Sequence, residues 1–324
     1  TIMNIRLYYL KMLICILISF ILLNIKITFK SMKKYSLSIF DFLSIIRCKD
    51  QIKNLIIFLP VFFSGDLYIS SQYFQISIQV FILFFFSTSI SYLLNDFFDF
   101  DEDKDHPMKS KKIIFKLNLS KYFLLRLIFI FSLLYFLFLL IFEVNFIAKL
   151  LTLLYILIVT LYSVILKKII YFEILLISSG YVIRLLSAEI ATNLYSDFLI
   201  FIIMFLSVSF VILLKRYSEF KKYINFRKVL QHYNSKTLLN LIFMNYFFII
   251  SAHFYYTFQN SIYTIYGLGG LLSNVLVIIV LTKFLISGTR QYTFEDPTNY
   301  LFNDLVSISS IFIYMGIFSS IMYL

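Results

Sequence analysis

Long apolar stretches, separated by short polar connections, run through almost the whole chain. Because the hydrocarbon core of a bilayer is about 30 Å thick, a membrane-spanning helix needs about 20 consecutive apolar residues. Stretches of this length lie near residues 54–72, 76–95, 122–142, 146–166, 172–190, 197–214, 238–257, 265–286 and 303–323. The pattern therefore predicts an all-α integral membrane protein, a bundle of nine transmembrane helices.

The composition excludes the main alternatives to a membrane protein. The 324 residues are 61% hydrophobic and only 14% charged, and the mean hydropathy is +0.90. Water-soluble domains are about half apolar and about a quarter charged. So apolar a chain, with 3 Pro and 7 Gly, cannot stay disordered in water. Two cysteines, Cys15 and Cys48, are too few for a disulfide-rich scaffold.

A further apolar run, at about residues 8–25, precedes Met32. Residues 1–31 are either an extra hydrophobic helix or upstream sequence read in frame, with Met32 as the true start. The second interpretation is slightly favoured, because a tenth span would break the alternation of basic and non-basic connections described next. The membrane domain is accordingly expected to comprise residues 32–324.

Basic residues separate the connections into two kinds. Connections 96–121 and 215–237 together hold thirteen Lys and Arg residues. The alternate connections hold none: 66–75, 143–146, 191–196 and 258–264. Basic loops stay in the cytoplasm, so the sequence predicts a multi-pass protein of the cytoplasmic membrane whose basic loops are cytoplasmic. The net charge of +12 reflects this topology, and nucleic acid is not an expected partner.

The second predicted span ends in a dense acidic cluster. Six of the 17 acidic residues lie within residues 96–105. At 100° per residue, Asp96, Asp99 and Asp103 share a helical face within about 60°. Carboxylates held together suit a hard cation, and Mg²⁺ is commonly shared between carboxylates and substrate phosphates. The alternative is a solvated acidic loop balanced by lysines, which does not explain why Asn95 and Asp96 end an apolar span.

These residues resemble a known family. The pattern Asn95-Asp96-x-x-Asp99-x-x-x-Asp103 resembles the first aspartate-rich motif of the UbiA prenyltransferase superfamily, whose members are nine-helix membrane enzymes. The stretch Asp103-Lys104-Asp105-His106-Pro107-Met108-Lys109 is similar to one in a narrower branch, the decaprenyl-phosphate phosphoribosyltransferases. The resemblance implies a UbiA-type bundle whose active site opens at the cytoplasmic side.

A second group of polar residues follows the fourth predicted span. Tyr162-Ser163-x-x-Leu166-Lys167 precedes Glu173, and Arg184 follows eleven residues later. Glu173 and Arg184 therefore share a helical face about three turns apart. The same branch shows this spacing, although it usually has Asp where this chain has Glu173. An arginine inside an apolar helix should face a partner, and the alternative is a purely structural ion pair of Arg184 with Glu189 or Glu143.

Two more segments extend the resemblance. Lys215-Arg216-Tyr217-Ser218-Glu219 is similar to an element that ends the sixth span in this branch, and Lys215 and Glu219 are expected to pair at i, i+4. Arg47-x-x-x-Gln51-x-Lys53-Asn54 resembles the segment before the first span. At Ser110-Lys111-Lys112 the branch tends to have an Arg-Pro pair, so Lys111 is not expected to be catalytic.

The resemblance assigns roles to these residues. Asp96, Asp99, Asp103 and Glu173 are expected to be catalytic and to bind Mg²⁺ and the diphosphate of the substrate. The predicted phosphate-binding residues are Asn95, Lys53, Lys109, Tyr162, Lys167, Arg184, Lys215 and Arg216. The implied cofactor is Mg²⁺, and the implied partners are a polyprenyl lipid, a diphosphate-bearing small molecule and membrane lipid.

Three functions are consistent with the sequence. The first is transfer of a phosphoribosyl group from 5-phosphoribosyl diphosphate to a polyprenyl phosphate. The second is a prenyltransferase that uses a polyprenyl diphosphate and an aromatic or other small acceptor. The third is a transporter or an inactive family member. A transporter should carry its carboxylates near the middle of the membrane, whereas these crowd one interface, so the enzyme is favoured.

Overall fold

The described parts of the chain are entirely helical. The computed structural model describes residues 38–64, 71–104, 112–166, 169–223, 233–259, 268–291, 294 and 297–323. The long helices are α4 (Gln72–Phe98), α7 (Lys121–Ile141), α8 (Phe146–Val164), α9 (Phe172–Thr192), α10 (Phe198–Tyr223), α12 (Ser235–Gln259), α14 (Leu268–Ile286) and α16 (Leu305–Tyr323). The short ones are α2 (Ile39–Ile45), the 3₁₀ helix η1 (Cys48–Phe58), α3 (Leu59–Phe63), α5 (Phe100–Lys104), α6 (Ile113–Lys116), the π-helix η4 (Ser287–Gln291) and α15 (Pro297–Asn303). The predicted extension, residues 1–31, lies outside the described residues.

Most of the predicted spans are confirmed as helices. In the described residues, seven helices are long and apolar enough to cross a membrane, and they correspond to the second through eighth predicted spans. The ninth corresponds to α16, whose apolar stretch, Leu305–Ser319, is shorter. Local sequence explains several starts, since the side chains of Ser71, Ser120 and Asn145 each accept a backbone N–H at the N-terminus of the following helix.

The first predicted span has a different structure. Residues 54–72 were expected to form one apolar α-helix, but the chain is a 3₁₀ helix as far as Phe58 and an α-helix only over Leu59–Phe63. Pro60 stands in the first turn of α3, where its missing N–H is tolerated. Residues 65–70 lie outside the described part. The expectation of nine spanning helices therefore stays a prediction.

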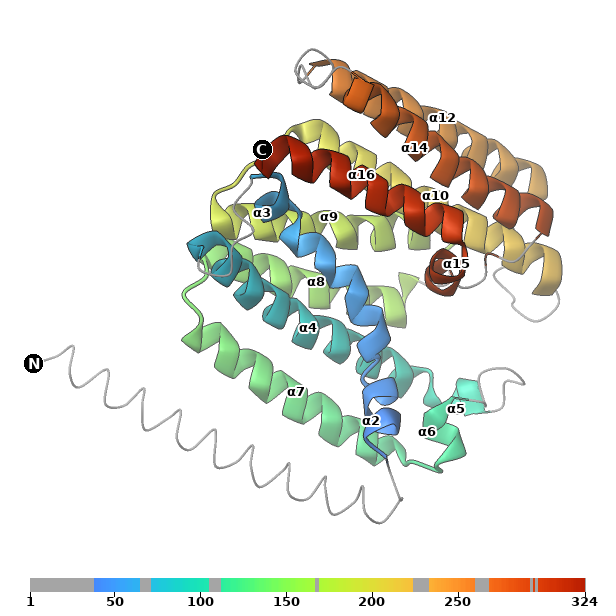
Figure 1. The fold of residues 1–324 in the computed structure, drawn as a ribbon. Coiled ribbons are helices and arrows are strands. Elements are labelled where there is room, and N and C mark those ends of the chain that lie inside the picture. The colour runs from blue at the N-terminus through green and yellow to red at the C-terminus, as the bar shows by residue number, and fades with distance from the viewer. Residues whose placement is uncertain are drawn as a thin grey trace, which may run out of the picture.

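Two helices form the centre of the bundle. In α4 and α9, 61% and 56% of the apolar stretch is buried, against 22% in α8 and in α12. Helices α7 and α8 pack against α4, α8 and α10 pack against α9, and α12 packs against α10. Figure 1 shows this order, with α12 and α14 farthest from α7. Aromatic and aliphatic side chains fill the interior, among them Phe84 and Leu185.

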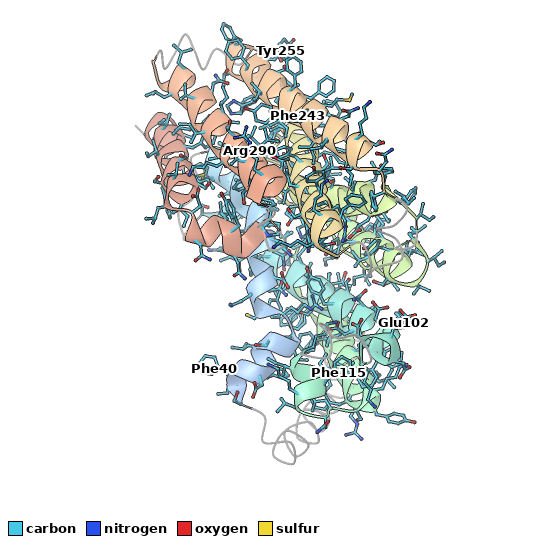
Figure 2. The ribbon with its side chains drawn as sticks, turned by 90° about the vertical axis from the view of Figure 1, so that its right-hand side faces the viewer. Phe40, Glu102, Phe115, Phe243, Tyr255 and Arg290 are labelled. Carbon is cyan, nitrogen blue, oxygen red and sulfur yellow. The ribbon has the colours of Figure 1, made fainter. Side chains whose placement is uncertain are left out.

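The outer faces of the bundle are apolar. Phe136 on α7, Leu157 on α8, Phe247 on α12 and Phe312 on α16 are all more than half exposed. Figure 2 shows Phe243 and Tyr255 pointing outward from α12. Exposed apolar surface of this extent is not stable in water, but lipid tails solvate it as well as a protein core does. The fold is therefore that of a multi-pass membrane protein.

Three of the short helices, α5, α6 and α15, gather at one end of the bundle (Figure 1). In Figure 1, α5, α6 and α15 lie at the end where α4 and α10 finish and α9 begins. Helix α2 packs against α6 and η1. The acidic cluster at the end of α4 and the basic residues Lys215 and Arg216 near the end of α10 belong to this end (Figure 1). The fold therefore brings together groups that are far apart in sequence.

Candidate functional site

The first acidic cluster is buried where α4 gives way to α5. Asp96 is in the last turn of α4, Asp99 is its C-cap, and Asp103 lies in α5. All three are less than 9% exposed. The backbone N–H of Asp99 donates to Asn95, and that of Asp103 donates to Asp99, so the chain continues its helical turn. Asp101 and Glu102 are exposed, so the solvated-loop interpretation is right for them and wrong for the three aspartates.

Two cations balance this buried charge. The ammonium of Lys112 lies 2.6 Å from Oδ1 of Asp96 and 2.8 Å from Oδ2 of Asp103. A guanidinium nitrogen of Arg47 lies 3.0 Å from Oδ1 of Asp96. Asp96 and Asp103 are thus close enough to share one cation, which is the arrangement that a hard divalent ion requires. Within the described residues, no three acidic, His or Cys side chains converge as a metal-binding group, so the protein offers two carboxylates here.

The 3₁₀ helix η1 carries the next ionic groups. Arg47, its N-cap, has a left-handed backbone with φ 53°, which is unusual for a residue other than glycine. This turn places its guanidinium 4.7 Å from the ring centre of Tyr92 and against Asp96. Further along the helix, the ammonium of Lys53 lies 2.9 Å from Oδ1 of Asp50 and 3.4 Å from the hydroxyl of Tyr92.

A cavity of about 700 Å³ opens beside Asp96. We call it the Asp96 cavity. Its basic side chains are Arg47, Lys49 and Lys112. Its apolar wall comes from α2 and α6 and includes Phe40, Leu43, Ile45, Ile113 and Ile114. Phe40 is 81% exposed, and Figure 2 shows it pointing away from the bundle. The cavity therefore combines positive charge with an apolar rim.

A second cavity, of about 380 Å³, lies beside the start of α9. We call it the Glu173 cavity. Lys53, Lys215 and Arg216 supply its positive charge, and Glu173 its negative charge. Most of the remaining lining is apolar: Ile52, Ile177, Val208, Val211, Ile212, Phe284 and Leu301. Both cavities can hold an anionic group next to an apolar one.

The two cavities meet at one ion pair. Asp50 lines the Asp96 cavity and Lys53 lines the Glu173 cavity, and their charged atoms are 2.9 Å apart. Burial lowers the pKa of Lys53, but two neighbouring phenol groups and Asp50 together outweigh it, so this pKa is raised above its ordinary value. Lys53 therefore keeps its positive charge at the boundary.

The second acidic group is held by Arg216. Its guanidinium forms ion pairs with both Glu173 and Glu219. Arg216 pairs with Glu219 at i, i+3. The charge of Glu219 also acts on Lys215, so the expected pairing of these two residues stays a prediction. Lys215 lines the Glu173 cavity, where the charges of Glu219 and Glu173 act on its ammonium. Tyr162 lies close enough to Arg216 to interact with its charge.

Arg184 lies deeper in the bundle and is only 3% exposed. Its nitrogens donate to the side-chain oxygen of Asn54 at 2.7 Å, the hydroxyl of Tyr155 at 2.8 Å and the carbonyl of Gly180 at 2.9 Å. The proposed ion pair with Glu189 or Glu143 is wrong, since all three partners are neutral. Arg184 lines neither of the two cavities described above.

The predicted site residues thus divide into three sets. Asp96 lines one cavity, and Asp103 is joined to it through Lys112. Glu173, Arg216, Lys53 and Lys215 line the other cavity. Asn95 contributes a backbone carbonyl to the turn at Asp99. Lys109 and Lys167 lie outside the described residues. Whether each residue acts as predicted stays a prediction.

Several residues of the site were not singled out from the sequence. Lys112 is one of several lysines near the cluster, and nothing in its spacing marks it as the one that reaches both Asp96 and Asp103. In the sequence, nothing distinguishes Tyr155 from the other aromatic residues of an apolar helix. Asn54 was named only as part of the segment before the first span and was given no role, although a buried amide next to an apolar stretch needs a partner.

Fold and site together define a class of protein: a helical membrane protein with paired carboxylates and two basic cavities at one end of the bundle. The model of the UbiA prenyltransferase family matches residues 57–298, which is most of the chain. The chain therefore belongs to the UbiA prenyltransferase family and is a membrane transferase. No curated protein sequence matches it.

Solved structures share the fold at low sequence identity. A UbiA homologue from Archaeoglobus fulgidus bound to DMAPP and Mg²⁺ has a TM-score of 0.59 and 16% identity, over 87% of this chain and 96% of that one. A UbiA homologue from Aeropyrum pernix K1 has a TM-score of 0.55 and 13% identity, over 82% and 98%. A structure described as digeranylgeranylglyceryl phosphate synthase has a TM-score of 0.55 and 16% identity, over 87% and 98%.

Proposed function

We propose that the protein is a Mg²⁺-dependent transferase that moves a phosphoribosyl group from 5-phosphoribosyl diphosphate to a polyprenyl phosphate at the cytoplasmic side of the membrane. The observation that carries the proposal is the pair of basic cavities that meet at Asp50 and Lys53. Each cavity has three basic side chains, and this reaction has a phosphate group on both substrates. The sequence likeness around Asp103 and Tyr162 supports the same branch.

The number of cations favours this reaction over prenylation of a small acceptor. A phosphoribosyl donor carries a diphosphate and a 5-phosphate, and the lipid acceptor adds a third phosphate group. Arg47, Lys49 and Lys112 line one cavity, and Lys53, Lys215 and Arg216 line the other. A prenyl diphosphate with an aromatic acceptor would place phosphate in only one of them.

Asp96 and Asp103, which share one cation, would hold the metal ion. Roles for Asp99 and Glu173 in metal binding remain part of the proposal. When bound, Mg²⁺ neutralises negative charge on the diphosphate. The bond between ribose C1 and the diphosphate oxygen breaks with its electron pair on the diphosphate, and an oxygen of the lipid phosphate forms the new bond to C1. Basic side chains that face the cavity stabilise the charge that develops on the leaving group.

The acceptor needs little activation. A lipid phosphate is already anionic at neutral pH, so no general base has to remove a proton from it. In the described residues, neither cavity is lined by a histidine. The chemistry therefore falls to charge neutralisation and to the positioning of both substrates.

One observation favours a second candidate, transfer of a prenyl group from a polyprenyl diphosphate. The lining of the Glu173 cavity is largely apolar beside its cations, which suits an isoprenoid attached to a diphosphate. A homologue with this fold was solved with DMAPP and Mg²⁺. In this alternative the Asp96 cavity would receive the small acceptor.

A transfer assay separates the two reactions. Purified protein in detergent is incubated with Mg²⁺, 5-phosphoribosyl diphosphate labelled in the ribose, and a polyprenyl phosphate, and label is measured in the lipid extract. We expect lipid-linked label that disappears with EDTA and in Asp96→Asn. The matched control is Asp101→Asn, whose carboxylate is exposed and whose loss should leave activity intact. No lipid-linked label, with prenylation of 4-hydroxybenzoate from a polyprenyl diphosphate, would reject the proposal in favour of the second candidate.

A further inference from the structure

We propose that Lys112 is a built-in counter-ion that occupies the cation position between Asp96 and Asp103, and that a divalent ion binds there only by displacing its ammonium. The inference rests on the metal site of the proposed function. It adds a residue that competes with the metal, so the affinity for the ion depends on Lys112 as well as on the two carboxylates.

The first argument is the position of the ammonium. It contacts one oxygen of each aspartate, at 2.6 Å and 2.8 Å, and the side chains of Asp96 and Asp103 are only 4% and 3% exposed. Buried carboxylates this close repel each other unless a cation lies between them. The ammonium of Lys112 therefore lies where a cation shared by the two carboxylates has to lie.

The second argument is that Lys112 can leave whereas its neighbour Arg47 is held. The backbone carbonyl of Lys112 accepts two N–H groups at the start of α6, which fixes the main chain. Its side chain is about as exposed as that of Arg47, at 27% against 30%, but it joins the backbone through a flexible four-carbon stem. Arg47 has a second hold, because its guanidinium also stacks on the ring of Tyr92. The lysine is thus the cation that gives way.

Displacement has a consequence for the substrate. Lys112 lines the Asp96 cavity. An ammonium released from the carboxylates therefore stays within that cavity, where it can contact the phosphate groups of a bound substrate. Entry of the metal thereby converts a cation that was neutralising the protein into one that is free to contact phosphate oxygens. Binding of the metal and the affinity for an anionic substrate are therefore coupled through the side chain of Lys112.

The test is direct binding of Mn²⁺ to the purified full-length protein in detergent, followed by electron paramagnetic resonance of the free ion, without any substrate. Lys112→Met keeps the stem and removes the charge. We expect its Kd for Mn²⁺ to fall at least about tenfold, equivalent to about 1.4 kcal/mol. Lys121→Met is the matched control, because Lys121 pairs with an aspartate that is 79% exposed, and its Kd should match that of the wild type.

Each outcome decides the question. An unchanged or higher Kd in Lys112→Met, with a circular dichroism spectrum like that of the wild type, overturns the proposal. Lys112→Gln repeats the test with a polar side chain, in case Lys112→Met alone disturbs the fold. Tighter binding must also be lost in the double variant with Asp96→Asn, or the ion is not bound at this pair. Because no transfer reaction is measured, a wrong substrate assignment would leave this result untouched.

Discussion

Asn54 connects Arg184 to the rest of the site, and replacing it with leucine removes that connection. Asn54 is completely buried. Its side-chain oxygen accepts a hydrogen bond from Arg184 at 2.7 Å, and its nitrogen donates to Gln51 at 2.7 Å. Gln51 in turn donates to Ser89 on α4. These contacts join η1, α4 and α9 into one polar network.

The magnitude follows from the groups that Asn54→Leu leaves unpaired. One is the Nε–H of Arg184, a charged donor, and the other is the side-chain oxygen of Gln51. A buried polar group without its partner costs about 1–3 kcal/mol, and a charged group costs more. Leucine keeps the branched shape of asparagine but is larger, so packing strain in this fully buried position adds to the loss. We expect a loss of about 3–5 kcal/mol, which corresponds to roughly 10 °C in the thermal midpoint.

Asn54→Asp is the control for this prediction. It keeps an oxygen that accepts from Arg184 and adds a charge that the guanidinium neutralises, and the amide of Gln51 can turn to donate to it. We expect a loss of no more than about 1 kcal/mol. The midpoint is measured by circular dichroism in detergent, because the chain has no Trp for fluorescence. If Asn54→Leu melts within about 2 °C of the wild type, or no lower than Asn54→Asp, the network does not stabilise the bundle.

Two further substitutions test packing and charge. Gly288→Ala places a methyl group 2.7 Å from Cδ2 of Leu214 and should cost about 1–3 kcal/mol, whereas Gly316→Ala, with nothing within 4 Å, should leave the thermal midpoint unchanged; equal midpoints would show that η4 adjusts freely. Lys215→Met removes a cation that lines the Glu173 cavity, so the KM for the diphosphate donor should rise about tenfold or more, with a much smaller effect on the midpoint than that of Asn54→Leu; an unchanged KM would mean that Lys215 does not contact the donor.

The long helices could be predicted from sequence because lipid imposes a simple rule. A chain that crosses a bilayer must satisfy its backbone internally and present apolar side chains for about 20 residues. The apolar stretches that result can be recognised from the amino-acid sequence alone. Helices such as α7 and α10 therefore begin and end within a few residues of expectation, apart from a polar extension of α10 that continues to Tyr223.

The partners within the site could not be predicted in the same way. Glu173 and Arg184 share a face of α9, as their spacing indicates, but eleven residues separate them by about 16 Å along the helix. Each therefore meets different neighbours, Arg216 in one case and Asn54 in the other. Periodicity gives the direction of a side chain, whereas its partner depends on which helices pack together at that depth.

The winding of η1 explains how one short segment serves both cavities and the network around Arg184. With three residues per turn, side chains at i and i+3 eclipse, so Asp50 and Lys53 lie in one row, directly after the left-handed N-cap Arg47. The buried residues Gln51, Asn54 and Ile57 form a second row on another face.

An α-helix here would disrupt both rows. At 100° per residue each step of three falls 60° short of a full turn, so six residues drift by about 120°. Asp50 and Lys53 could then no longer lie in one row. Asn54 would be rotated by about 60° relative to Ile57, away from Arg184. The weaker hydrogen bonds of a long 3₁₀ helix are offset by the side-chain bonds of Gln51 and Asn54 to α4 and α9. The same residues that position Arg184 therefore hold the ionic row of η1 in register with the carboxylates of α4.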